Sequence, residues 1–181
     1  MSPKHFFAGL LLLLAGCAAP PPAVTIKADE FSPAIRIDGP AGQFHAFSGT
    51  DWTWRLRSWV DKPTRQVTHQ LYVFTIVYGD YQYFQLAADD TAQSLPVTVI
   101  DRSIDRSADC RHLDCEHYET FGIAVDDAML RTRAETGYRV KVTGRRGEEL
   151  ILPLSPTQIR LQLAAVDRLI LSPAPAAAPA R

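Results

Sequence analysis

Apolar and polar residues alternate with a period of two along most of the chain, which predicts a protein built mainly from β-strands. The segment 51–60, DWTWRLRSWV, places Trp52, Trp54 and Leu56 on one face and hydroxyl or charged side chains on the other. The step at Ser58 and Trp59 predicts a β-bulge. Further strands are predicted at 23–27, 35–38, 43–47, 95–101, 119–125, 138–143 and 149–154. Short strands at this spacing indicate an antiparallel sandwich or a strongly curved sheet.

The segment 69–87, HQLYVFTIVYGDYQYFQLA, contains two β-rich runs on either side of Gly79 and Asp80, a pair that suits a tight hairpin turn. The predicted hairpin has the cross-strand pairs Tyr78 with Tyr81, Ile76 with Tyr83, and Phe74 with Gln85. The first run is apolar on both faces. This pattern predicts an interior strand that a second layer covers.

Two segments depart from the two-residue period and predict helices. The first spans 126–135, with Asp126 or Asp127 as its N-cap and Gly137 as its stop. The second begins at 155–158, Ser-Pro-Thr-Gln, where the serine and glutamine suit a capping box and the proline suits the first turn. Its apolar stripe, which we expect to lie against the sheet, is Ile159, Leu163, Val166 and Ile170. The predicted fold class is α+β, mostly β.

The first sixteen residues have the layout of a secretory signal: a basic start with Lys4, an apolar run at 6–14 and a small pair. The apolar run is about nine residues long, shorter than the ~20 that span a bilayer as a helix. It ends in Leu14-Ala15-Gly16-Cys17, which resembles the lipobox of bacterial lipoproteins.

The resemblance implies that the chain is cut before Cys17 and that this cysteine carries a diacylglyceryl group on its sulfur and a third acyl chain on its amine. Two or three acyl chains hold a protein firmly on a membrane, whereas one holds it marginally. In lipoproteins of this kind an aspartate after the cysteine favours the inner membrane. Ala18 stands there in this chain. The implied location is therefore the outer membrane, with the folded part in the periplasm.

The expected organisation has four parts. Residues 1–16 are the signal peptide, and residues 17–23 are a lipidated, proline-rich tether. A single β-rich domain spans 24–171, and a disordered tail rich in proline and alanine spans 172–181. The chain has a formal charge of −1, and removal of the signal peptide takes away Lys4 alone among its charged residues. So small an imbalance gives no reason to expect nucleic acid as a partner.

Two further cysteines, Cys110 and Cys115, lie in the segment DCRHLDCEH. In an oxidising periplasm two such thiols are expected to form a disulfide. The alternative is a metal site that also uses His112 and His117, and it requires the thiols to stay reduced. So short a segment wraps a single ion poorly. The disulfide is therefore the preferred interpretation, and no cofactor or metal is predicted.

Two groups of side chains are candidates for ligand binding. Arg102 and Arg106, in DRSIDRS, have the chemistry to bind an anion. The preferred interpretation is a solvated strand end where the neighbouring aspartates neutralise them. The aromatic residues have the chemistry to line a glycan or peptide groove, or else fill the core. They are Trp52, Trp54, Trp59, Tyr78, Tyr81 and Tyr83. Tyr78 and Tyr81, beside the predicted turn, are the ones expected to reach solvent.

The sequence contains no glycine-flanked nucleophile elbow, HExxH motif, Walker loop or dinucleotide fingerprint. The leading hypothesis is a non-enzymatic lipoprotein, attached to the membrane by its lipid, that binds an envelope protein or the cell wall. One alternative is an envelope hydrolase that uses His69 or His45, which a cleft joining either histidine to a serine or carboxylate would favour. The other is metal handling by the loop between Cys110 and Cys115.

Overall fold

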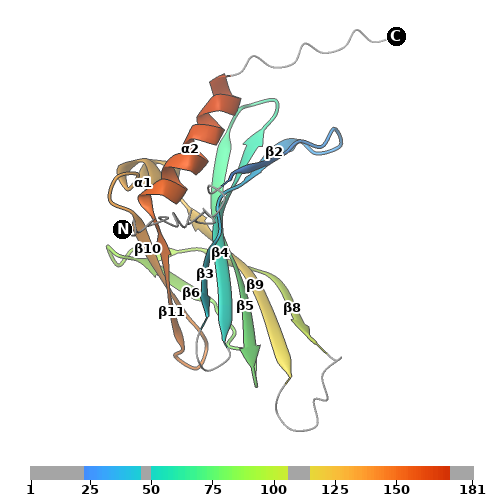
Figure 1. Cartoon of the computed structure of the whole chain (residues 1–181), viewed down its shortest axis with the longest axis vertical. Coiled ribbons are helices and arrows are strands. Elements are labelled where there is room, and N and C mark those ends of the chain that lie inside the picture. Colours follow the sequence, from blue (N-terminus) through green and yellow to red (C-terminus); the bar gives the residue numbers. More distant parts are fainter. Residues whose placement is uncertain (1–22, 46–49, 106–114, 172–181) are drawn as a thin grey trace, which may run out of the picture.

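A computed structural model of the chain describes residues 23–45, 50–105 and 115–171. These residues form two antiparallel sheets and two helices (Figure 1). The predicted class, α+β and mostly β, is confirmed.

The larger sheet has seven strands in the order β1-β2-β4-β5-β9-β8, with β3 paired to the first half of β4. Their bounds are β1 Thr25–Lys27, β2 Ala34–Asp38, β3 Gly42–His45, β4 Asp51–Asp61, β5 Val67–Tyr78, β8 Val97–Ile104 and β9 Glu116–Val125. The smaller sheet has the order β11-β10-β6-β7. Its strands are β6 Leu86–Asp89, β7 Ser94–Leu95, β10 Tyr138–Thr143 and β11 Glu149–Leu154.

The predicted hairpin around Gly79 and Asp80 is wrong. Strand β5 pairs with β4 on one side and β9 on the other, so Ile76 lies opposite Asp51 and Tyr118. The chain after the turn leaves this sheet and joins the smaller one at β6. The physical reason is a competing partner: the backbone N–H groups of Gln82 and Tyr83 donate to the carboxylate of Glu119 instead of to β5.

The predicted bulge at Ser58 and Trp59 is also wrong, because the ladder between β4 and β5 continues through both residues without a shift. Ser58 lies on the inward face, where its hydroxyl has polar partners, so the polar residue does not disturb the alternation. The larger sheet does contain an irregularity, at the step between Val99 and Asp101 in β8.

The core lies on one side of the larger sheet. In Figure 1 the two helices and the smaller sheet all lie on that side. Helix α2 (Pro156–Leu171) packs on β2 and β4, and the smaller sheet covers the inward side chains of β4, β5 and β9. The largest fully buried hydrophobic side chains are Ile37, Leu56, Leu71, Phe121, Ile123, Leu130, Tyr138, Leu152, Leu154 and Ile159. Among the described elements, none covers the other side of the sheet.

The helix starts follow the sequence signals, but α1 (Asp127–Thr132) ends with Arg133 as its C-cap, before the predicted end at 135. Asp126 caps α1 by accepting from the backbone N–H of Met129 at 3.1 Å. At α2, Ser155 and Gln158 form the predicted capping box: the Ser155 hydroxyl accepts from the Gln158 N–H at 3.2 Å, and the Gln158 amide oxygen accepts from the Ser155 N–H at 2.9 Å. Neither described helix is both long and apolar enough to cross a membrane.

Candidate functional site

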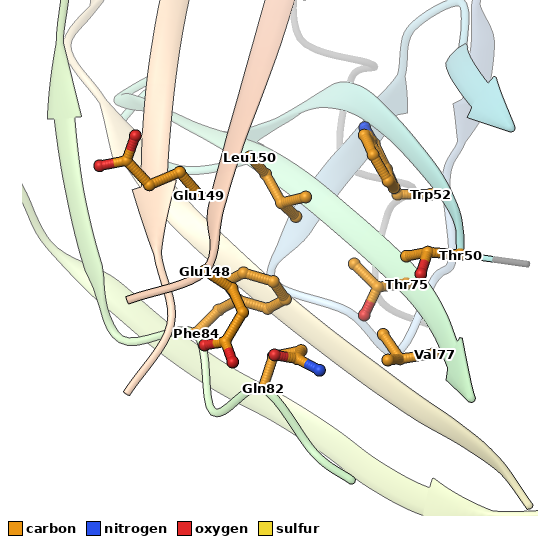
Figure 2. A pocket seen from close by; sticks show the side chains of 9 residues that line it. All are labelled: Thr50, Trp52, Thr75, Val77, Gln82, Phe84, Glu148, Glu149 and Leu150. Carbon is orange, nitrogen blue, oxygen red and sulfur yellow. The ribbon is translucent and has the colours of Figure 1, made fainter. Parts of the chain in front are cut away.

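A pocket of about 230 Å³ opens between the two sheets at one end of the molecule (Figure 2). We call it the inter-sheet pocket. It is lined by Thr50, Trp52, Thr75, Val77, Gln82, Phe84, Glu148, Glu149 and Leu150. Pockets for drug-sized ligands occupy roughly 300–1,000 Å³. This volume therefore suits a single small group, such as one sugar ring or one side chain.

The two sheets and one loop each supply part of the lining. Thr75 and Val77 point inward from β5, because alternate residues of a strand share a face. Trp52 points inward from β4, and Leu150 points inward from β11. Gln82 comes from the segment between β5 and β6. Figure 2 shows the side chains of Thr75 and Gln82 directed into the space between the sheets.

The loop that carries Gln82 is held by a buried carboxylate. Glu119 is only 2% exposed, and it accepts from the backbone N–H of Gln82 at 2.5 Å and of Tyr83 at 3.0 Å. Arg102 completes the arrangement, with its Nε 3.1 Å from Glu119 and its guanidinium 4.7 Å from the centre of the Tyr83 ring. Tyr83 has a positive φ of 55°, a conformation that is unfavourable for a residue other than glycine. The hydrogen bonds to Glu119 offset this cost.

The turn between β10 and β11 closes the pocket on the other side. The backbone N–H of Arg145 donates to the Gln82 carbonyl at 2.9 Å, which joins this turn to the loop. The Glu148 carboxylate accepts from the Arg146 N–H at 3.2 Å and forms no ion pair with any described residue. Glu149 pairs with Lys141 at 2.9 Å, and its carboxylate points away from the other lining residues in Figure 2. Glu148 is therefore the negative charge of the pocket.

Trp52 gives the pocket an aromatic wall. Its ring stacks on Phe44, with 4.5 Å between ring centres and 26° between ring planes. Phe44 itself is 48% exposed. The Trp52 indole nitrogen and the Gln82 amide oxygen have no hydrogen-bond partner and are sealed from solvent. A ligand in the pocket as it stands therefore contacts the Trp52 ring and not its nitrogen.

The other predicted aromatic residues have different surroundings. Trp54 is 6% exposed and belongs to the core, where its indole N–H donates to the Pro153 carbonyl at 2.7 Å. Trp59 lies on the outward face of β4. Tyr78 is 47% exposed, and its hydroxyl donates to Glu116 at 2.7 Å, which raises the pKa of this phenol. Tyr78 is therefore solvent-accessible but does not line the pocket.

Tyr81 lies edge-on to His117, with 4.6 Å between ring centres, and is half-buried. Like Tyr78, it does not line the inter-sheet pocket. Arg102 forms the ion pair described above, which leaves its Nε committed to Glu119. Of the remaining predicted site residues, Cys115 directly precedes β9, and Cys17, Arg106 and Cys110 lie outside the described residues. Lipidation, the disulfide and a joint anion site of Arg102 and Arg106 stay predictions.

His69 belongs to a buried hydrogen-bonded chain. Its Nδ1 lies 2.7 Å from the Ser58 hydroxyl, and its Nε2 lies 2.9 Å from the Asp127 carboxylate. The Gln162 amide N–H donates to Ser58 at 2.7 Å and to the Ile37 carbonyl at 3.1 Å. Burial lowers the pKa of His69 below its ordinary value of 6.5, and this effect outweighs the opposing pull of Asp127. The neutral ring satisfies the chain, with Nε2–H donating to Asp127 and Nδ1 accepting from Ser58.

This chain contains the residue types of a hydrolytic triad but lacks its accessibility. Ser58 is 0% exposed, so a substrate carbonyl does not reach its hydroxyl in this arrangement. The two ring nitrogens also have the opposite partners from those of a serine-hydrolase triad. There Nε2 activates the serine and the carboxylate binds Nδ1, whereas in His69 Nδ1 faces Ser58 and Nε2 faces Asp127. His45, the other predicted histidine, lies 2.9 Å from Asp51 at an exposed position.

Among the described residues, no three histidine, cysteine, aspartate or glutamate side chains are grouped so that they could hold a metal ion. His112 and Cys110, which the metal hypothesis requires, lie outside the described residues. That hypothesis stays open at this position.

No family model, curated protein or solved structure matches the chain. The geometry of the inter-sheet pocket is therefore the basis for proposing what it binds. Sequence reasoning named Trp52 as a possible groove residue but missed Gln82 and Glu148. A signal for Glu148 existed, because it follows Gly147 in a polar turn between two well-alternating strands. Gln82 had none, because its place depends on the bond from its backbone to Glu119.

Proposed function

We propose that the chain is a lipid-anchored, non-enzymatic binding protein of the cell envelope, and that its inter-sheet pocket holds a sugar ring of the cell wall. The observation that carries this proposal is the combination of the Trp52 ring and the Glu148 carboxylate in one small pocket. The lipid anchor comes from the lipobox at Cys17. Such an anchor keeps the folded part within reach of the wall.

The chemistry of the lining suits a carbohydrate. A flat aromatic ring offers a large contact area for the apolar face of a sugar. The Glu148 carboxylate is placed to accept from a sugar hydroxyl, and hydrogen bonds to a charged group are about twice as strong as neutral ones. Thr75 donates its hydroxyl proton to the Glu119 carbonyl at 3.3 Å, which leaves its oxygen as an acceptor. The pocket therefore offers stacking and polar contacts together.

The carboxylates of the pocket support a proposal of binding without cleavage. Glycoside hydrolysis ordinarily needs two carboxyl groups across the bond, about 5–9.5 Å apart. In the pocket only Glu148 is free of an ion pair with the described residues, since Glu149 is held by Lys141 and points away. The hydrolase alternative through His69 is not supported by the buried position of Ser58.

The test is co-sedimentation of the purified, detergent-solubilised protein with insoluble cell-wall sacculi. We expect Glu148→Gln to weaken binding about tenfold or more, the usual effect of losing a hydrogen bond to a charged acceptor. The matched control is Glu135→Gln, which removes the same charge from an 80% exposed side chain paired with Arg160.

Two outcomes would overturn the proposal: no sedimentation of the wild-type protein with sacculi, or an equal loss of binding in the control variant. The anchor is tested separately by the mass of the protein from its native host. A mass equal to that of the bare polypeptide from residue 17 onward would remove the lipid from the proposal.

A further inference from the structure

The outward face of the larger sheet carries a group of basic and aromatic side chains close to β1. We call this group the tether-side patch. It consists of Lys27, Arg36, Arg55, Arg57, Trp59 and Tyr72. These residues share one face because they are either register partners or alternate residues on β1, β2, β4 and β5. Among the described elements, no helix or strand covers the patch.

The patch has an excess of positive charge. Asp38, which is 6% exposed in its side chain, lies 3.5 Å from Lys27, 3.3 Å from Arg36 and 3.1 Å from Arg57. The contact with Arg57 is an ion pair without the alignment of a hydrogen bond. Arg55 forms no ion pair with any described residue. One buried carboxylate therefore serves three cations, and a fourth is free of such pairing.

One more carboxylate occupies an outward position at this end of the sheet. Asp61, the last residue of β4, accepts from the backbone N–H and the hydroxyl of Thr64. Over the sheet positions alone, four cations exceed two anions. The adjoining turns add two acids and two bases, Asp29, Glu30, Lys62 and Arg65, so the excess of two positive charges is kept. This excess contrasts with the slightly acidic balance of the whole chain.

The aromatic residues of the patch are of the types that concentrate at a membrane–water interface. The Arg57 guanidinium lies 3.3 Å from the centre of the Tyr72 ring, and Trp59 is the register partner of Arg36. Tryptophan and tyrosine concentrate at membrane–water interfaces, where an apolar ring and a polar edge are both accommodated. Arginine and lysine place apolar stems in the same region while their charges meet the headgroups.

The opposite end of the same face is acidic. Asp51, Asp101 and Glu116 occupy outward register positions there, away from the patch. An anionic membrane surface would attract the basic end and repel the acidic end. The charge pattern therefore selects one orientation of the sheet.

We propose that the tether-side patch lies on the anionic phospholipid headgroups of the membrane that holds the lipid anchor. The inference rests on the lipid at Cys17, the anchor of the proposed function. Cys17 precedes Thr25, the first residue of β1, by eight residues, which span at most roughly 30 Å. The lipid therefore stays close to the patch. Because Trp52 follows Asp51 at the acidic end, this orientation directs the inter-sheet pocket away from the membrane.

The experiment uses the lipidated protein, confirmed by mass, reconstituted into vesicles of neutral phosphatidylcholine or of the same lipid mixed with anionic phosphatidylglycerol. The readout is quenching of Trp59 fluorescence by acrylamide, an uncharged aqueous quencher. The Trp59→Phe variant identifies the contribution of this ring. We expect quenching of Trp59 to fall at least twofold in anionic vesicles relative to neutral ones.

The double variant Lys27→Gln/Arg55→Gln tests the charge. Each cation at an anionic surface is expected to change the ratio of bound to free orientations about fivefold, so the pair should restore quenching to its level in neutral vesicles. The matched control, Lys141→Gln/Arg160→Gln, removes two exposed cations from β10 and α2 and should keep the protection.

Equal quenching of Trp59 in both kinds of vesicle would overturn the inference, and so would an equal effect of the control pair. Either result, obtained with lipid present on Cys17, leaves wall binding by the pocket untouched. Failure of wall binding with protection of Trp59 intact would reject the proposed function and keep the membrane contact.

Discussion

The two faces of the larger sheet are built by alternate residues of the same strands, yet they are packed in different ways. Facing inward, Leu56, Leu71 and Phe121 are at most 1% exposed, under α2 and the smaller sheet. Facing outward, Tyr72 and Phe74 remain half-buried with no described layer above them. The apolar side chains of β5 therefore belong to the core on one face and to the surface on the other.

The polar residues differ in the same way. Inward polar groups are tied to the protein: Ser58 and His69 share a chain that reaches both helices, and Glu119 binds a loop and an arginine. Buried polar groups are tolerated only when they are hydrogen-bonded in this manner. On the outward face, Arg36 and Arg57 pair with the buried Asp38, whereas Arg55 forms no ion pair with any described residue. The inward polar groups thus stabilise the fold, while the outward face, apart from the cluster around Asp38, is available for contact.

The largest expected effect on the free energy of unfolding comes from replacing a phenylalanine on each of the two faces. Phe121→Ala should lower the free energy of unfolding by about 4 kcal/mol, because it removes a fully buried ring and leaves a cavity. Phe74→Ala, on the outward face of the neighbouring strand, should cost about 1 kcal/mol, since the ring is only half-buried. Urea denaturation measures both values. Equal losses would contradict the difference in burial between the two faces.

A second comparison uses serine. Ser58→Ala should lower the free energy of unfolding by about 2 kcal/mol, because it leaves His69 Nδ1 without its donor and removes an acceptor from Gln162 in a sealed site. Ser103→Ala, on the outward face of β8, should change it by less than about 0.5 kcal/mol. A loss at Ser58 no larger than at Ser103 would show that the buried chain contributes nothing to stability.

The pH dependence of stability tests the same chain. Burial lowers the pKa of His69, so the unfolded chain takes up this proton first as the pH falls below 6.5. The stability that the neutral ring contributes is present in full above pH 6.5 and is lost between 6.5 and the lower pKa of the folded state, at no more than about 1.4 kcal/mol per pH unit.

Denaturation of the wild type and of His69→Gln at a series of pH values from 8 to 5 measures this loss as a difference. The variant should show a shallower decline, because it lacks the imidazole whose pKa differs between the folded and the unfolded chain. Asp127, whose pKa is lowered from 3.8 despite its partial burial, acts only at more acidic pH and does not interfere. Parallel declines would place the titrating group elsewhere.

Local signals predicted local structure well. The helix starts at Asp126 and at Ser155 were both readable because a cap depends on residues within one turn. Strands β10 and β11 have the predicted bounds, since each keeps a clean alternation. The inward set of Trp52, Trp54 and Leu56 also matches the prediction.

Predictions that depended on distant partners failed. The apparent hairpin after Tyr78 is opened by Glu119, which lies about forty residues further on and competes for the backbone N–H groups of the loop. The apparent bulge at Ser58 disappears because Gln162 and His69 satisfy its hydroxyl in the core. The inter-sheet pocket depends on the same long-range contact through Gln82. No local sequence pattern could therefore have predicted this pocket.

The smallest expected effect is on the outward face itself. Arg55→Gln should change the free energy of unfolding by less than about 0.5 kcal/mol, because Arg55 forms no ion pair with any described residue and solvent reaches this face. Arg57→Gln should lower the free energy of unfolding by more than Arg55→Gln does, because it removes one of the three cations that pair with the buried Asp38. Urea denaturation of both variants separates a free cation from a structural one. A loss at Arg55 as large as at Arg57 would show that Arg55 stabilises the fold. The tether-side patch would then have no cation that is free of a structural role, since Asp38 already pairs with the other three.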